Sequence, residues 1–339
     1  MRWEDIQGQE RAVKLLKGAL ARGHAHHAYL LAGPEGTGKE LLARTFAQAA
    51  NCEAEDAQAR PCGRCASCRG IERGNFPDVM VVMPQAEMLA RGLLSRADLE
   101  AAPSRDIRVD DVRALARRLS FAALRGRRKI AIVLPADAMN ERAQNTLLKT
   151  LEEPPPSTTF LLVSANPDAL LPTIRSRCAR VQLGPVPREA LAARLVREGI
   201  PEAEARERAA RAQGSFSRAL QAEGSWGELL SGVERALAAP DEREALDLAE
   251  ACGEREAALE VAEAVHAWTR DLLVAGSGGE PGLRELAGRA REIAGAVPPR
   301  ALLAQASLCA QVIEALRQNG NGRLQIERLL LGARELRHA

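Results

Sequence analysis

The chain of 339 residues is poor in aromatic side chains, with three Trp, one Tyr and five Phe. A surface that binds single-stranded nucleic acid by stacking bases on aromatic rings is therefore not expected. An excess of one charge is also lacking, because 47 Lys and Arg are balanced by 45 Asp and Glu, leaving a net charge of +2. This balance excludes a polybasic nucleic-acid coat as the dominant property of the protein.

Long hydrophobic runs are missing as well. No stretch approaches the ~18 consecutive apolar residues that a membrane span requires, and the N-terminal MRWEDIQGQE lacks the apolar core of a secretory signal. We therefore expect a cytoplasmic protein. Charged residues make up 27% of the chain and hydrophobic residues 46%, which is typical of a globular protein. The length suggests two or three domains that need no disulfide bonds for stability.

The first half of the chain alternates apolar runs with segments of helical periodicity. The apolar runs predict buried strands at 28–32, 78–83, 129–134, 158–164 and 179–183. The periodic segments predict helices at 8–22, 38–50, 108–120 and 139–152. Strands that alternate with helices favour a parallel sheet covered by helices on both faces. We therefore predict an α/β domain over residues 1–186.

After Pro185 and Pro187 no convincing strand pattern appears. Helical patterns run through 187–199, 201–212, 215–222, 226–238, 241–273, 283–295, 299–318 and 322–337. Alanine, the best intrinsic helix former, is frequent in the last third. We predict a small helical domain over 187–224 and an all-α C-terminal domain over 225–339.

A glycine-rich turn, GPEGTGKE, follows the first predicted strand and precedes a helix. Gly33, Gly36, Gly38 and Lys39 fit a phosphate-binding loop, in which backbone N–H groups and a helix N-terminus hold phosphates and the lysine reaches the outer ones. However, Glu40 stands where such loops have the Ser or Thr that binds Mg²⁺. Two interpretations remain open: a nucleotide site, and a vestigial loop that keeps the turn but not the ligand.

Hydrolysis would also need an acidic residue at the end of a later strand, to hold Mg²⁺ and polarise water. The strand 129–134 ends instead in Leu134 and Pro135. Asp137 lies further on, where we expect it in the first turn of the next helix as an N-terminal cap. Because two parts of the hydrolytic machinery are missing, we predict that the chain alone does not turn over ATP.

Four of the seven cysteines are crowded at Cys52, Cys62, Cys65 and Cys68. In a reducing compartment such a cluster favours a metal over disulfides. Four thiolates in a short polar segment suit a structural, tetrahedral Zn²⁺ that replaces a hydrophobic core. An iron–sulfur cluster and inert thiols are the alternatives. The remaining three, Cys178, Cys252 and Cys309, lie in apolar or helical contexts and are expected to be packing residues.

Further motifs occur in a characteristic order. HAYLLAGPEGTGK precedes the four-cysteine segment, and IRVDDVRAL, QNTLLKTLEEPPP, NPDALLPTIRSRC, QGSFSRAL and NGNGRLQIERLLL follow it. In the residues of these motifs and in their order, the chain resembles the clamp-loader branch of the AAA+ ATPases, and within it the delta-prime family of bacterial DNA polymerase III. The resemblance covers nearly the whole chain. It implies a P-loop AAA+ domain, a helical lid domain and a C-terminal collar domain that mediates oligomerisation.

The resemblance also implies a function in DNA replication. Loaders of this kind are pentameric rings that open a sliding clamp and close it on primed DNA, with ATP between neighbouring subunits. The implied partners are gamma/tau motor subunits, a delta subunit, the clamp and primer–template DNA. Arg177 matches the arginine finger that acts in trans on a neighbour's ATP, and Arg218 matches the second-sensor arginine that contacts nucleotide in cis. The family's delta-prime members do not hydrolyse ATP. This agrees with Glu40 in place of Ser or Thr and with Leu134 in place of an acidic residue. An ATP-hydrolysing motor subunit of the same ring is the alternative.

Two segments stay without a definite role. The stretch 105–129 carries nine basic residues, for which a DNA-facing patch and a solvated helix face are both open, the second being favoured. Residues 84–104 are longer than a strand–helix connection needs, and the sequence assigns them no function.

Overall fold

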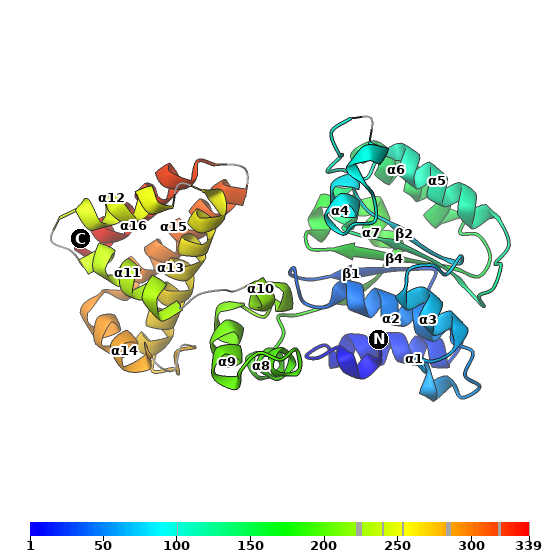
Figure 1. The fold of residues 1–339 in the computed structure, drawn as a ribbon, viewed down its shortest axis with the longest axis horizontal. Coiled ribbons are helices and arrows are strands. Elements are labelled where there is room, and N and C mark those ends of the chain that lie inside the picture. The colour runs from blue at the N-terminus through cyan, green and yellow to red at the C-terminus, as the bar shows by residue number, and fades with distance from the viewer. Residues whose placement is uncertain are drawn as a thin grey trace. The chain divides into compact units, whose positions relative to one another are not determined.

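The computed structural model describes residues 1–99, 101–221, 226–238, 241–252, 254–282, 286–317 and 320–338. It divides into two compact units. Figure 1 shows the chain coloured by residue number. Residues 1–194 and 213–217 form what we call the sheet unit, and residues 195–212 and 218–339 form the helical unit. The predicted three-part division at residues 186 and 224 stays a prediction.

A five-stranded parallel sheet forms the centre of the sheet unit, in the order β2-β3-β4-β1-β5. The strands are β1 (Ala28–Ala32), β2 (Val79–Val82), β3 (Lys129–Val133), β4 (Thr158–Ser164) and β5 (Ala179–Gln182). Every residue of β1, β3 and β4 is buried, which explains why apolar residues occupy most positions of these strands. All five predicted strands are confirmed.

Helices cover both faces of this sheet (Figure 1). One face is covered by α1 (Glu10–Ala21), α2 (Lys39–Asn51) and α3 (Ala66–Glu72), and the other by α5 (Val109–Ser120), α6 (Glu141–Glu152) and α7 (Pro172–Arg177). Neighbouring strand residues serve opposite faces, so Leu31 packs with Phe46 of α2, while Leu30 packs with Leu147 of α6. The predicted α/β fold class is confirmed.

Short elements complete the sheet unit. The helix α4 (Gln85–Ala90) lies within the long connection after β2. Single 3₁₀ turns are η1 (Trp3–Asp5), η2 (Ala57–Ala59), η3 (Arg96–Asp98), η4 (Ala136–Ala138) and η5 (Pro167–Ala169).

Within the described ranges the chain forms helices alone after β5. They are α8 (Arg188–Arg197), α9 (Glu202–Arg211), α10 (Phe216–Gln221), α11 (Trp226–Ala238), α12 (Arg243–Ala251), α13 (Arg255–Gly276), α14 (Ala287–Ala296), α15 (Pro299–Arg317) and α16 (Gly322–His338). The prediction of one helix over 241–273 is wrong: α12 packs on α16 and α13 packs on α15, so each buries its own apolar face. None of these described helices is both long and apolar enough to cross a bilayer.

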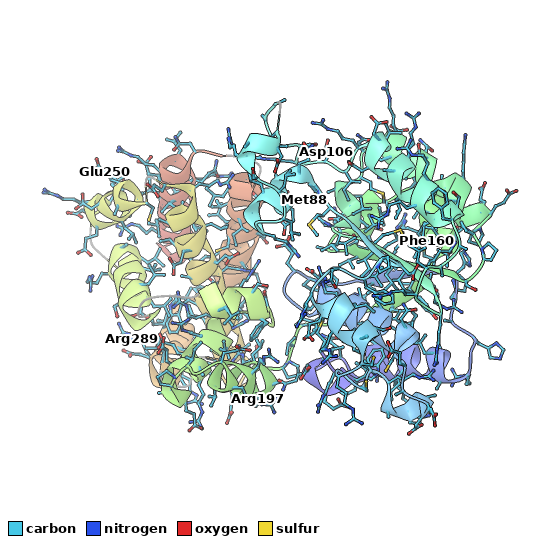
Figure 2. All side chains as sticks on the ribbon, turned by 45° about the vertical axis from the view of Figure 1, so that its right-hand side comes forward. Met88, Asp106, Phe160, Arg197, Glu250 and Arg289 are labelled. Carbon is cyan, nitrogen blue, oxygen red and sulfur yellow. The ribbon has the colours of Figure 1, made fainter. Side chains whose placement is uncertain are left out.

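Apolar side chains fill the interior of each unit, and most charged side chains lie at the surface. Figure 2 labels Phe160, which lies inside the sheet unit and is fully buried. It also labels Glu250 and Arg289, which are exposed on helices of the helical unit. The three cysteines predicted to be packing residues, Cys178, Cys252 and Cys309, are all buried.

Candidate functional site

The glycine-rich loop connects β1 to α2 and depends on its glycines. A Cβ atom on Gly33 would lie 2.3 Å from the Leu183 carbonyl oxygen, so no side chain fits there. Gly36 and Gly38 have φ values of +70° and +90°, a region that L side chains rarely adopt. The chain therefore forms the predicted phosphate-loop backbone at the N-terminus of α2.

Lys39 is buried and folded back onto this loop. Its Nζ donates hydrogen bonds to the carbonyl oxygens of Gly33, at 2.6 Å, and Pro34, at 2.5 Å. Burial lowers the pKa of Lys39, while the nearby carboxylates of Glu35 and Asp137 oppose the shift. The ammonium group is thus satisfied by protein oxygens, and a phosphate would have to take their place.

Glu40 is engaged by two arginines. Its Oε1 accepts hydrogen bonds of 2.8 Å from Arg44, one turn along α2, and from Arg91, which follows α4. Burial alone would raise the pKa of Glu40, but the hydrogen bonds from Arg91 and Arg44 outweigh it and lower that pKa. The connection 84–104 therefore supplies a charge to the loop. Sequence reasoning missed Arg91, since it lies 51 residues from Glu40 in the chain.

The residue that follows β3 is Leu134, and its side chain is buried. The prediction of Asp137 as a helix cap is wrong. Asp137 lies in η4, where its Oδ1 accepts a 3.3 Å hydrogen bond from the N–H of Ala165 just after β4. The η4 turn delays the start of α6, so its cap falls on Asn140, which accepts from the N–H of Ala143 at 2.9 Å. Asp137 instead stands at the carboxyl edge of the sheet, near Lys39.

The motif QGSFSRAL contacts the loop through a residue that the sequence did not single out. The N–H of Phe216 donates to the carbonyl oxygen of Gly36 at 2.8 Å. Ser215 is buried, and its Oγ lies 2.0 Å from the place of a Cβ on Gly36. Arg218, predicted to contact nucleotide, forms an ion pair with Glu263 at 3.3 Å. Whether it meets a nucleotide stays a prediction.

The four predicted metal ligands come together. The Sγ atoms of Cys52, Cys62, Cys65 and Cys68 all lie within 4.8 Å of one another. Four sulfurs at about 2.3 Å from a tetrahedral zinc would be separated by roughly 3.8 Å, so the donor set fits such an ion with small adjustments. Burial opposes ionisation of Cys62, but the N–H groups of Arg64 and Cys65 lower the pKa of Cys62 to about 6. The cluster can hold a metal ion.

Hydrogen bonds attach this cysteine module, residues 52–68, to the rest of the sheet unit. Gln48 of α2 donates to the Cys68 carbonyl oxygen at 2.9 Å, and the indole N–H of Trp3 donates to the Arg60 carbonyl oxygen at 2.8 Å. Within the module, Glu53 accepts from both the N–H and the hydroxyl of Ser67. A bound metal would therefore hold together a segment that also contacts η1 and α2.

Arg177 is the last residue of α7 and lies at the surface, with its side chain 36% exposed. Its Nη2 donates to Glu152 at 2.7 Å, and its Nη1 donates to the Thr173 carbonyl oxygen at 3.0 Å. These contacts hold a half-buried guanidinium at the surface in one orientation. Arg175, two residues earlier, forms an ion pair with Asp168. It offers a matched control for the role predicted for Arg177.

Not every cation of the basic stretch 105–129 lies at the surface. Lys129 is buried and donates to the Leu119 and Phe121 carbonyl oxygens, and Arg113 forms an ion pair with Asp110 on α5. The buried carboxylate of Asp78 accepts from three successive N–H groups, those of residues 124–126. These hydrogen bonds fix the loop after α5. Phe121, at the start of this loop, is 69% exposed.

Comparison with known proteins agrees with the motifs. The family model for the DNA polymerase III delta subunit matches residues 8–187. The delta-prime subunit of Pseudomonas aeruginosa DNA polymerase III is 39% identical over 198 residues, which are 58% of this chain and 54% of that protein. The tau subunit of Escherichia coli is 35% identical over 237 residues, 70% of this chain and 33% of that protein. The chain thus spans between a third and about half of the length of these relatives.

Among solved structures, a DNA polymerase III gamma-subunit-related protein from Thermotoga maritima aligns over 96% of this chain and 99% of that chain. The sequence identity is 20% and the TM-score 0.43. The RuvB branch migration motor of the same organism aligns over 73% of this chain and 70% of that chain, with 20% identity and a TM-score of 0.38. Because the family model covers more than half of the 339 residues, the chain belongs to the DNA polymerase III delta-subunit family of clamp-loader proteins.

Proposed function

We propose that this chain is a non-hydrolysing subunit of the DNA polymerase III clamp loader. It would serve in DNA replication as a rigid part of the ring that loads the sliding clamp onto primed DNA, and it would supply Arg177 in trans to a neighbour's ATP site. Its partners would be the gamma/tau motor subunits and the delta subunit, with the clamp and primer–template DNA bound through the complex. We propose a cytoplasmic location, a structural Zn²⁺ in the cysteine module, and no ATP turnover in cis.

The observation that carries the proposal is the contrast between Lys39 and Arg177. Lys39 is buried and already bonded to Gly33 and Pro34, whereas Arg177 is half-buried at the surface and held in place by Glu152. The cis site has Leu134 and Pro135 at the end of β3, so the acid that would bind Mg²⁺ at that strand end is missing. A delocalised guanidinium at the surface suits the charge that develops on a neighbour's phosphoryl oxygens.

The test is the DNA- and clamp-stimulated ATPase of a reconstituted loader with Arg177→Ala in this subunit. Arginine fingers are worth about 10³–10⁵ in rate, so hydrolysis at the adjoining site should fall by about 10³ or more. Arg175→Ala is the matched control and should leave that rate within about twofold, because Arg175 is an ion-paired arginine of the same helix, like Arg177, but does not match the family's finger position. An unchanged rate for Arg177→Ala, with equal assembly, would remove the finger role.

The second candidate is an ATP-hydrolysing motor subunit of the same ring. It is favoured by the retained loop backbone at Gly33 and Gly38 and by the position of Asp137 near Lys39. Turnover of Mg-ATP by the isolated chain, abolished by Lys39→Ala, would establish it. Background turnover in both proteins supports the non-hydrolysing role.

A further inference from the structure

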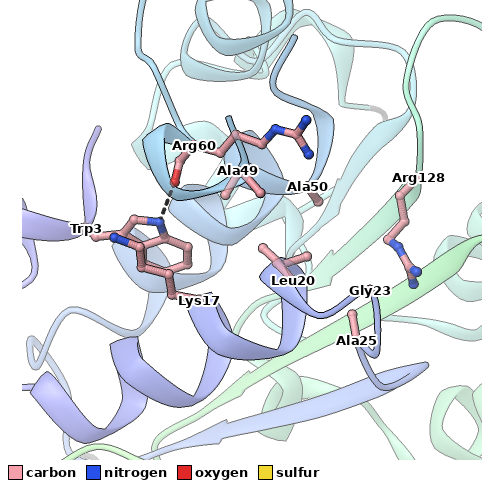
Figure 3. Close-up of a pocket in the computed structure, with 10 residues that line it drawn as sticks. Trp3, Lys17, Leu20, Gly23, Ala25, Ala49, Ala50, Arg60 and Arg128 are labelled. Carbon is pink, nitrogen blue, oxygen red and sulfur yellow. Dashed lines mark hydrogen bonds between the residues drawn. The ribbon is translucent and has the colours of Figure 1, made fainter. Parts of the chain in front are cut away.

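A cleft of about 110 Å³ opens beside α1 and the cysteine module, at the amino edge of the sheet (Figure 3). Ala25 lies just before β1 and Arg128 just before β3, whereas the phosphate loop follows the carboxyl end of β1. The cleft is therefore separate from the candidate nucleotide site. One water needs roughly 10–15 Å³ of such space, so this cleft has room for a polyatomic group.

The charges around the cleft all have one sign. Among the described residues that line it, Lys17, Arg60 and Arg128 are positive and none is acidic. All three are half-buried, and none of them forms an ion pair within the described ranges. Arg44, which is also half-buried in this unit, is by contrast paired with Glu40, as is the exposed Arg91. The cleft thus gathers three cations without a neutralising protein group.

The hydrogen bonds of the two arginines orient them but leave their charge in place. Arg60 donates to the carbonyl oxygens of Ala54, at 2.8 Å, and Glu55, at 3.2 Å. Arg128 donates to the hydroxyl of Thr159 at 2.9 Å. Figure 3 shows Arg60 and Arg128 on different sides of the cleft. Each guanidinium has five N–H donors, so both retain donors for a ligand.

The remaining wall is apolar or small, and it includes Leu20, Ala25 and Ala49. Apolar surroundings weaken screening, which strengthens the attraction of the three cations for an anion. Arginine forks match the oxygens of phosphate in particular. We propose that this cleft binds a phosphate group, either of a free nucleotide or inorganic phosphate, or of a nucleic-acid backbone.

The cysteine module contributes directly to this site. Arg60 lies inside the module, and its carbonyl oxygen accepts from the buried indole of Trp3, which forms another part of the wall. Metal binding by Cys52 and Cys62, on either side of Arg60, would hold that cation in place. Removal of the metal should therefore weaken phosphate binding, in addition to its effect on stability.

The experiment measures binding of inorganic phosphate by calorimetric titration at constant ionic strength, using a Lys39→Ala chain so that the phosphate loop does not contribute. Lys17→Gln should weaken phosphate binding at least about tenfold, the equivalent of one charge-assisted contact. Lys14→Gln is the matched control, since Lys14 is exposed on the same helix and does not line the cleft. Arg128→Gln provides a second variant.

Two further arms identify the source of the phosphate. A single-stranded oligonucleotide without terminal phosphate should displace inorganic phosphate if the cleft takes a nucleic-acid backbone, and dAMP alone should displace it if the cleft takes free nucleotide. No phosphate binding in the Lys39→Ala chain, or equal effects of Lys14→Gln and Lys17→Gln, would overturn the proposal. Either result leaves the role of Arg177 unaffected, because that role is tested by the loader's ATPase.

Discussion

The cysteine module and the phosphate loop are both short motifs in the sheet unit, but they differ in what completes them. In the module four sulfurs lie within 4.8 Å of one another, and a shared cation would stabilise them as thiolates. In the phosphate loop, protein groups already neutralise or bind the charged side chains. Lys39 donates to carbonyl oxygens of the loop, and Glu40 accepts hydrogen bonds from Arg44 and Arg91. Motif spacing thus predicts where donor groups gather, while the contacts that these groups already make within the protein decide how many of them a ligand could still use.

The largest effect should come from removing the metal. Cys65→Ser takes away one ligand, and we expect loss of stoichiometric zinc and a loss of stability of the sheet unit on the order of 4 kcal/mol or more. Metal content and thermal unfolding check this. Cys178→Ser, a buried cysteine outside the module, should keep the zinc. A Cys65→Ser chain that binds no metal but melts like the parent would contradict the structural role of the module.

A smaller loss of stability should follow from adding a side chain to a glycine of the phosphate loop. Gly36→Ala imposes a positive φ on alanine and places its Cβ 2.0 Å from the Ser215 hydroxyl oxygen, whereas Gly38→Ala imposes the positive φ alone. We expect both to cost about 1 kcal/mol for the backbone, with about 1–3 kcal/mol more for Gly36→Ala from the overlap. Chemical denaturation measures the difference, and Ser215→Gly should recover part of it. Equal costs would mean that Ser215 does not close the loop.

The smallest effect concerns the charges that hold Glu40. Because the folded-state pKa of Glu40 is lowered, its ion pairing with Arg91 stabilises the protein above the unfolded pKa of about 4.3 and is lost as pH falls through the folded pKa. Arg91→Ala should therefore cost about 1 kcal/mol at pH 7 and progressively less below about pH 4. Unfolding measured across this range is the check.

The matched control for Arg91→Ala is Arg113→Ala, which breaks the exposed pair with Asp110. Exposed pairs of this kind contribute about 0.3–0.5 kcal/mol, so its cost should be smaller. If the cost of Arg91→Ala is independent of pH, then Arg91 acts on the loop through packing and not through the charge of Glu40.

Much of the sheet unit could be predicted because its signals are local. The run Thr158–Ser164 has an apolar centre, FLLV, and its strand is buried from end to end. The helix over 139–152 was predicted two residues too long, because η4 turns the chain before Asn140 caps α6. The predicted helix over 241–273 failed for another reason: two amphipathic helices with similar periodicity follow one another there.

The strands, the loop backbone and the grouping of the four cysteines could be predicted from local sequence, because hydrophobic period, glycine conformation and cysteine spacing act over a few residues. Only the tertiary structure decided that Arg91 meets Glu40, that Ser215 covers Gly36, and that Asp137 turns toward Ala165. It also decided that Lys17, Arg60 and Arg128 share one cleft. Such contacts join residues tens to hundreds of positions apart, and they depend on how the sheet and its helices pack.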